Sequence, residues 1–340
     1  MAYIGYVIRK LREKNNMSQE VLAEGICTSK YIYLIEKGDR NPSSDILSQL
    51  GEKLDTDLFD FYEYIDCEDP VAVREMFNEF LKYRGQMNLV RLLKLNHEAR
   101  ALPDFQRAPW SYELKVNEYM YMLLIEKKYE EIKELLMQDI DFYDKNTIEG
   151  QCRTRLNILL ALCYEGLGDI EKSCMVITNV VDSMKIKRNC YKDLHLIVMA
   201  HCTYMGIHSA VGNYENVISK GVEICKLQEE FNAYEMLHYC FFFLAFTYKK
   251  LHMKDRSRDF LEKGILLSLL NDKYTDISYL TDRGIIPELL KGHVISGELV
   301  DRFTSKYHLP KQGKSEDVKS CILISQGGSE NHCTSNNCSI

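Results

Sequence analysis

Residues 17–42 constrain this 340-residue chain more than any other segment, because they have the pattern of two short helices joined by a tight turn. Ser18 is a good N-cap for the first helix, and Thr28 is a good N-cap for the second. Gly25 permits the bend between them. Gly38 stands where a helix-ending residue with positive φ is expected. Such a pair of helices can present one helix to the major groove of DNA.

Apolar residues at helical spacing flank this pair and predict a compact bundle over residues 1–66. Ile4, Ile8 and Leu11 recur at i, i+4 and i+7, which predicts an amphipathic helix that ends near Lys14. After Pro42 and Ser43 a further helix is expected, with the apolar stripe Ile46, Leu47, Leu50 and Leu54. A last turn at Leu58, Phe59 and Phe61 closes the expected core.

The order of these elements resembles the helix-turn-helix domain of the phage-repressor (Cro/C1, or XRE) family. The resemblance covers the N-terminal segment and rests on Ser18, Gln19, Leu22, Ala23, Ile32, Ile35, Glu36, Gly38, Asn41, Pro42 and Ser43. It implies that the second helix of the pair enters the major groove of a double-stranded DNA operator.

In that arrangement the groove-facing helix leads with its N-terminus, so Ser29, Lys30 and Tyr31 are expected to reach base edges or phosphates. Gln19 resembles the family's groove-flanking glutamine, which would hold a phosphate together with backbone N–H groups. The full set of expected DNA contacts is Gln19, Thr28, Ser29, Lys30, Tyr31, Tyr33, Leu34, Arg40 and Asn41.

Three of these positions have alternative explanations. Leu34 offers only apolar contact, for example to a thymine methyl, where relatives often carry a polar residue. Tyr31 and Tyr33 are aromatic residues at helical spacing, which are more often packing residues than base readers. The alternative for the whole set is that these side chains only solvate a small bundle.

Net charge places any DNA contact at the N-terminus. The chain has a net charge of −7, which argues against indiscriminate binding to nucleic acids. Residues 1–54 contain eight Lys and Arg against seven Asp and Glu, so this segment carries +1 and the remainder carries −8.

Composition predicts a cytoplasmic protein with reduced cysteines. No run approaches the roughly 18 apolar residues of a membrane span, and the N-terminus lacks the long apolar stretch of a secretory signal. The 12 cysteines lie mostly in apolar helical stretches without CxxC pairs or histidine partners at metal spacing. Buried thiols are therefore expected, with neither disulfides nor a metal site.

Catalytic motifs are missing from the sequence. It has no P-loop, no GxSxG, no HExxH and no Gly-rich dinucleotide turn, and its nine histidines are scattered. An enzyme is therefore the least supported class, and no cofactor is expected.

A recurrence of turns organises the chain from Val71 to Leu270. Helical apolar runs are interrupted at intervals of about 40 to 45 residues, a period that predicts stacked helical hairpins. The turns lie at residues 83–85, 127–129, 166–169, 211–214 and 251–253.

Two of the expected hairpins resemble tetratricopeptide repeats. One has Leu160, Ala161 and Tyr164 before its turn, and Ser173, Ile177 and Val180 after it. The other has the matching residues Ala245, Tyr248, Ser257 and Leu261. The fold class is therefore expected to be all-α, with a helix-turn-helix bundle at 1–66 followed by a tetratricopeptide-like α-solenoid at 71–307.

The first helix of each hairpin lines the concave side of such a solenoid, where an extended peptide can lie. An Asn could hold a peptide main chain there, and Arg155 could pair with a carboxylate. The expected groove residues are Asn117, Tyr121, Arg155, Asn157, Ile158, Thr203, Tyr239, Phe242 and Phe246. The alternative is packing for the aromatic residues and a solvated helix face for Asn117, Arg155 and Asn157.

The combination of a repressor-type head and degenerate tetratricopeptide hairpins resembles the Rgg, PlcR and NprR class of pheromone-sensing transcription factors. This resemblance implies a homodimer whose grip on DNA changes when a short signalling peptide binds the concave groove. At Thr203 the chain departs from the class, because PlcR-like proteins place an Asn there.

The C-terminal segment changes character after residue 307. One or two further helices are expected within residues 275–307, and residues 308–340 form a Ser, Gly, Asn and Cys-rich tail that we expect to be disordered. The leading hypothesis is a DNA-binding transcriptional regulator of the quorum-sensing type, switched by a peptide. The alternative is a protein-interaction scaffold in which the array binds a partner protein and the DNA-binding head is auxiliary.

Overall fold

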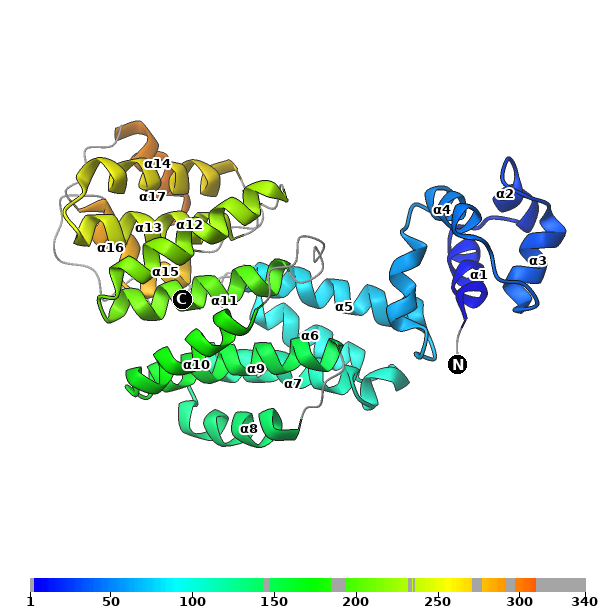
Figure 1. The fold of residues 1–340 in the computed structure, drawn as a ribbon, viewed down its shortest axis with the longest axis horizontal. Coiled ribbons are helices and arrows are strands. Elements are labelled where there is room, and N and C mark those ends of the chain that lie inside the picture. The colour runs from blue at the N-terminus through cyan, green and yellow to red at the C-terminus, as the bar shows by residue number, and fades with distance from the viewer. Residues whose placement is uncertain are drawn as a thin grey trace, which may run out of the picture. The chain divides into compact units, whose positions relative to one another are not determined.

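A computed structural model describes residues 3–142, 147–184, 194–231, 234, 236–270, 277–291 and 297–309 of the chain. Every regular element among these residues is a helix, which confirms the all-α prediction. Figure 1 shows the small head at the N-terminus and the longer helices that follow it.

The head contains α1 (Ile4–Lys14), α2 (Gln19–Ala23), α3 (Ser29–Lys37), α4 (Ser44–Lys53) and the 3-10 turn η1 (Leu58–Tyr64). The expected caps are present: the hydroxyls of Ser18, Thr28 and Ser43 accept hydrogen bonds from backbone N–H groups in the first turns of α2, α3 and α4. Gly38 ends α3 with a φ of 85°. The spacing of apolar and capping residues was therefore sufficient to place these helices.

One glycine sets the distance between two helices of the head. A Cβ added to Gly5 of α1 would lie 1.8 Å from the carbonyl oxygen of Ile35 in α3. The two helices therefore approach more closely than any side chain would allow. Around this contact lies a core made of Ile4, Val7, Ile8, Leu11, Leu22, Ala23, Ile32, Ile35, Leu47, Leu50, Leu54, Leu58, Phe61 and Val71.

The remaining helices form consecutive hairpins. The described elements are α5 (Pro70–Gly85), α6 (Leu89–Ala99), η2 (Pro103–Gln106), α7 (Trp110–Leu124), α8 (Tyr129–Phe142), α9 (Thr147–Gly166), α10 (Ile170–Ser183), α11 (Leu194–Ala210), α12 (Tyr214–Glu230), α13 (Leu237–Lys250), α14 (Lys254–Leu270), α15 (Ser278–Asp282), α16 (Ile285–Leu290) and α17 (Gly297–Lys306). Each of the five expected turns lies at or beside a junction between two helices. The described residues after 275 contain three helices, where one or two were expected.

Two hairpins each contain a hydrogen bond of the same kind, from a buried serine in the second helix to an alanine carbonyl in the first. The buried hydroxyl of Ser173 in α10 donates to the carbonyl of Ala161 in α9 at 2.8 Å. The buried hydroxyl of Ser257 in α14 donates to the carbonyl of Ala245 in α13, also at 2.8 Å. Both pairs are separated by 12 residues, so the small residues that suggested a repeat occupy equivalent positions in the two hairpins.

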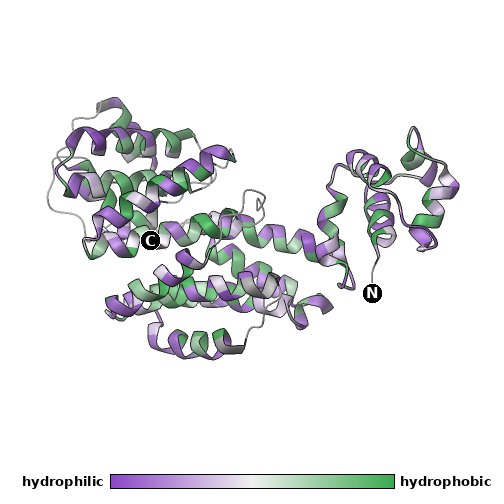
Figure 2. Ribbon diagram, in the orientation of Figure 1, coloured by the Kyte–Doolittle hydropathy of each residue, from purple (hydrophilic) through white to green (hydrophobic). Residues whose placement is uncertain are grey.

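The chain divides into two compact units, Met1–Ile207 and His208–Ile340, and the division falls inside α11. The head and the first hairpins belong to the same unit. Residues 194–209 of α11 are all buried or half-buried, and Figure 2 shows this ribbon as largely hydrophobic. Of the predicted tail at residues 308–340, residues 310–340 lie outside the described residues.

Composition predicts buried, reduced cysteines and no membrane-spanning segment. The described cysteines are free thiols, and all of them are buried or half-buried. Among the helices that the structure describes, none combines the length and the apolar character needed to cross a membrane.

Candidate functional sites

Polar side chains lie on the surface of the head at the start of α3 and in the loop after it. Lys30 and Arg40 are exposed, and neither forms an ion pair or a side-chain hydrogen bond with any residue that the structure describes. Ser29 is half-buried at the first turn of α3. These groups can therefore meet a phosphate without first giving up an internal partner.

Other residues of the expected DNA surface have structural contacts. Thr28 caps α3, since its hydroxyl accepts from the Tyr31 N–H at 3.2 Å. The Tyr31 hydroxyl donates to the carbonyl of Asn41 at 3.4 Å, which ties α3 to the loop after it. Tyr33 is 49% exposed, and Leu34 is half-buried. Tyr33 therefore contributes little to packing, in contrast to the packing alternative.

A buried carboxylate fixes α3 against the two helices before it. Glu36 is only 6% exposed, and its side chain accepts two hydrogen bonds from Arg12 at 2.6 and 3.0 Å. The Gln19 amide donates to the same carboxylate at 2.7 Å. The Tyr3 hydroxyl donates to the Glu36 carbonyl at 2.7 Å. Gln19, expected to hold a phosphate, therefore also orients α2 relative to α3.

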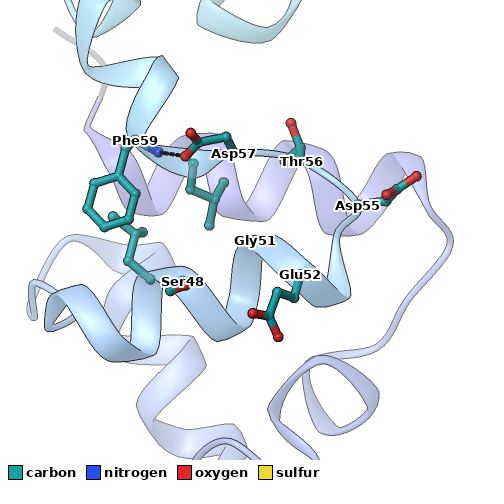
Figure 3. A pocket seen from close by; sticks show the side chains of 9 residues that line it. Ser48, Gly51, Glu52, Asp55, Thr56, Asp57 and Phe59 are labelled. Atoms are coloured by element: carbon teal, nitrogen blue, oxygen red, sulfur yellow. Dashed lines mark hydrogen bonds between the residues drawn. The ribbon is translucent and has the colours of Figure 1, made fainter. Parts of the chain in front are cut away.

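The other side of the head carries an acidic pocket of about 510 Å³ between α4 and η1, drawn in Figure 3. Glu52, Asp55 and Asp57 line it, and Asp57 accepts a hydrogen bond from the Phe59 N–H at 2.9 Å. Figure 1 shows α4 and α3 at opposite sides of the head. The concentration of carboxylates repels phosphate, so this pocket does not extend the surface around Lys30 and Arg40.

The expected groove residues of the repeat region are mostly buried in the structure. Asn117, Arg155, Ile158, Thr203, Tyr239 and Phe242 are at most 7% exposed, whereas Tyr121, Asn157 and Phe246 are half-buried. Those in the first unit do not share one set of contacts. Asn117 and Arg155 lie in a polar cluster, and Ile158 belongs to an apolar core with α10 and α11.

The remaining groove candidates make local contacts. The Thr203 hydroxyl donates to the carbonyl of Met199 in its own helix at 3.0 Å, and the Asn157 amide donates to the carbonyl of Arg153 at 2.9 Å. In the second unit Phe242 packs so tightly on α14 that a Cβ at Gly264 would lie 3.0 Å from its ring. The ring of Phe242 also lies 5.9 Å from that of Phe303 in α17.

The polar cluster centres on Glu113 of α7, which is fully buried. Its Oε2 pairs with Arg84 Nη2 of α5 at 2.7 Å, and its Oε1 pairs with Arg155 Nη1 of α9 at 2.9 Å. The thiol of Cys152 donates to the same Oε1 at 2.8 Å. One carboxylate therefore joins three helices and faces two guanidinium groups.

Electrostatics determine the protonation states in this cluster. Burial alone would raise the pKa of Glu113, but the adjacent guanidinium groups of Arg155 and Arg84 overcome that effect and hold its pKa at about 2. Burial keeps the pKa of the Cys152 thiol well above its ordinary value. The carboxylate is therefore ionised and the thiol neutral at pH 7.

Two asparagines carry the network toward the surface. Arg84 Nε donates to Asn117 Oδ1 at 2.7 Å, and Asn117 Nδ2 donates to Asn96 Oδ1 at 2.7 Å. Asn96 Nδ2 in turn donates to the carbonyl of Leu114 at 2.7 Å and to Glu118 at 3.3 Å. Both amides are therefore occupied within the chain.

Residues 8–61 match the family model described as helix-turn-helix. The N-terminal head is a helix-turn-helix domain. In this helix-turn-helix domain α2 and α3 are the paired helices, and α3 is the helix expected to enter the groove. No curated protein sequence matches the chain.

Solved structures resemble most of the chain in fold. PlcR of Bacillus thuringiensis, in complex with the peptide PapR7 and DNA, is 16% identical and has a TM-score of 0.59, with 86% of this chain and 100% of that chain covered. ComR of S. thermophilus, in complex with DNA and its signalling peptide ComS, is 20% identical with a TM-score of 0.48, covering 85% and 98%. Rgg2 of Streptococcus dysgalactiae, a pheromone receptor, is 15% identical with a TM-score of 0.41, covering 89% and 100%.

The similarity in fold rests on PlcR, because the TM-scores of the other two structures are lower. It shows that a helix-turn-helix domain followed by helical hairpins is an arrangement that PlcR shares.

Sequence reasoning missed Arg12, Arg84 and Glu113 as organising residues. Glu113 had a detectable signal, because it lies on the stripe Trp110, Glu113, Asn117 and Met120, where a charged residue interrupts apolar helical spacing. No sequence signal marked Arg84 as buried, because its position at an expected turn suggested that it is exposed. Arg12 was assigned to a polar face, and only the fold brings it to Glu36.

Proposed function

We propose that this chain is a cytoplasmic DNA-binding transcriptional regulator that acts by binding rather than by catalysis. Its helix-turn-helix domain contacts a double-stranded operator, its helical repeats bind a short signalling peptide, and the working form is a homodimer.

The observation that supports DNA binding best is a pair of exposed basic residues, one at the start of α3 and one in the loop after it. Lys30 and Arg40 are exposed and have no ionic partner among the described residues, in a domain that matches the helix-turn-helix family. The bridge from Glu36 to Arg12 and Gln19 holds α3 rigidly behind these groups. A fixed helix with unpaired cations is what phosphate contact requires.

Support for a peptide ligand comes from the repeats. PlcR was solved in complex with a peptide and DNA, and its fold covers most of this chain. The described repeats also contain aromatic side chains suited to an extended peptide, such as Tyr121, which is half-buried.

A direct connection between the repeats and the head lies in α5. At its start Val71 belongs to the core of the head, and Arg74 donates to Thr56 and Asp60 at 3.2 Å in each case. At its end Arg84 belongs to the buried cluster. A ligand that favours one arrangement of the repeats can shift the head through this helix. Two heads in a homodimer would then read half-sites one or more helical turns apart.

The first experiment tests DNA binding. The full chain selects duplexes from a random DNA pool, and a selected duplex is then titrated with the wild-type chain and with Lys30→Ala/Arg40→Ala. Because two phosphate contacts are lost, we expect at least a tenfold weaker affinity and a salt dependence reduced by about two charges.

The matched control is Lys94→Ala/Arg153→Ala, which removes two exposed cations outside the head. It should leave the affinity for the selected duplex unchanged. Equal affinities of the wild type and the Lys30/Arg40 variant would rule out the proposed surface.

The second experiment tests the peptide ligand. Short peptides encoded beside the gene are titrated into the full chain by calorimetry, and we expect one of them to bind. If none binds while DNA binding persists, the result would favour the alternative hypothesis, a scaffold whose repeats bind a partner protein, over a peptide-switched regulator.

A further inference from the structure

Among the residues that the structure describes, the cluster around Glu113 has one more positive charge than negative charges. Arg84 and Arg155 contribute two positive charges, Glu113 contributes one negative charge, and Cys152 is neutral. The side chains of the two arginines are 1% and 4% exposed, and that of Glu113 is fully buried. Because water does not screen charges at such a site, a second carboxylate would be strongly attracted to it.

The hydrogen bonds of the cluster are also incomplete. Arg84 Nη1 is buried and has no hydrogen-bond partner among the described residues. Its Nε and Nη2 donate to Asn117 and to the carbonyl of Glu113. Because Glu113 divides its two oxygens between two arginines, it cannot give Arg84 the two-pronged contact that guanidinium and carboxylate groups favour.

We propose that Glu113 is an internal counter-ion that occupies Arg155 until a ligand carboxylate displaces it. The ligand carboxylate then pairs with Arg155, and Glu113 turns fully to Arg84, where Nη1 lacks an acceptor. The exchange converts a cluster with a net charge of +1 into a neutral one. This inference rests on the proposed function only for the identity of the natural ligand, a peptide that offers one carboxylate.

The exchange of carboxylates would change the position of the head, because Arg84 lies in the last turn of α5, the helix that leads to the head. The other end of the same helix is fixed to the head by Val71 and by the contacts of Arg74. A helix of this length spans about 24 Å as a rigid rod. Glu113 therefore couples the occupancy of Arg155 to the position of α5.

The test uses acetate as a probe, so that no peptide is needed. Thermal unfolding of the full chain is measured at pH 7 in sodium acetate and in sodium chloride at the same ionic strength, about 100 mM. Because acetate supplies the missing carboxylate, we expect the midpoint in acetate to exceed that in chloride by about 3 °C or more.

Arg155→Met is the variant of choice, since it leaves a neutral pair of Arg84 and Glu113 and should fold. It should lose the difference between acetate and chloride. Arg100→Met, which removes a surface partner of Glu118, is the control and should keep that difference.

An equal response of the wild type and Arg155→Met to acetate would overturn the proposal, as would a wild type that does not distinguish the two anions. Because the readout requires neither peptide nor DNA, a failed peptide titration would leave this result standing. The two hypotheses can therefore fail separately.

Discussion

Two pairs of basic residues in this chain have opposite surroundings. Lys30 and Arg40 are exposed and have no ionic partner among the described residues, whereas Arg84 and Arg155 are buried on one carboxylate. The first pair can bind an anion without any rearrangement. The second pair must give up an internal partner first, so its binding is coupled to a change in structure. The exposed pair is therefore suited to a permanent DNA-binding surface, and the buried pair is suited to a site where ligand binding changes the structure.

Removing the shared carboxylate should have the largest effect. In Glu113→Gln the two buried guanidinium groups lose their counter-ion, so the free energy of unfolding should fall by about 3 to 5 kcal/mol. Denaturant unfolding followed by circular dichroism measures the change. Glu118→Gln, which alters a pair with the exposed Arg100, should cost no more than about 1 kcal/mol. Similar losses in the two variants would mean that Glu113 is not the centre of the cluster.

Acid should weaken the cluster in a defined range. The pKa of Glu113 is about 2 in the folded chain and about 4.5 when the chain is unfolded, so its contribution is complete above pH 4.5 and disappears as the pH falls toward 2. The loss is on the order of 3 kcal/mol for this group. Arg155→Met should show a shallower decline over the same range, because one of the two neighbouring cations is gone. Parallel pH curves would contradict this explanation.

A smaller loss of stability is expected when the serine-to-alanine-carbonyl hydrogen bond of either hairpin is removed. Ser173→Ala and Ser257→Ala each remove one buried hydrogen bond to an alanine carbonyl, so each should cost about 1 kcal/mol. Ser183→Ala, in which an exposed serine is changed, should stay within about 0.5 kcal/mol of the wild type. Unequal losses at positions 173 and 257 would show that the hairpins are not equivalent.

The exposed pair should have the smallest effect on stability. Lys30→Ala/Arg40→Ala removes no internal contact, so its free energy of unfolding should stay within about 0.5 kcal/mol of that of the wild type even though DNA affinity falls. A large loss of stability would show that these residues pack within the head.

Local chemistry explains which features could be predicted from the sequence. Capping residues such as Ser18 and Thr28 act on neighbours three residues away, so the helices of the head and the turns between hairpins could be placed. The pairing of Ala161 with Ser173 was also accessible, because small residues recur at the same spacing near Ala245.

The polar interior was less predictable for a physical reason. Glu113 meets Arg84 and Arg155 only after α5, α7 and α9 have packed, and contacts between residues so far apart leave no local pattern. Asn117 and Arg155 were expected on an open groove, and whether they contact a peptide stays a prediction. In the described structure their polar groups contact other parts of the chain.

The most direct test of the central claim is reciprocal titration with a selected DNA duplex and a peptide that binds. The affinity of the full chain for the duplex is measured with and without saturating peptide, and its affinity for the peptide with and without duplex. If the repeats control the head, peptide should change DNA affinity at least about fivefold, and DNA should change peptide affinity by the same factor. A chain that binds both ligands with no mutual effect would contradict the account.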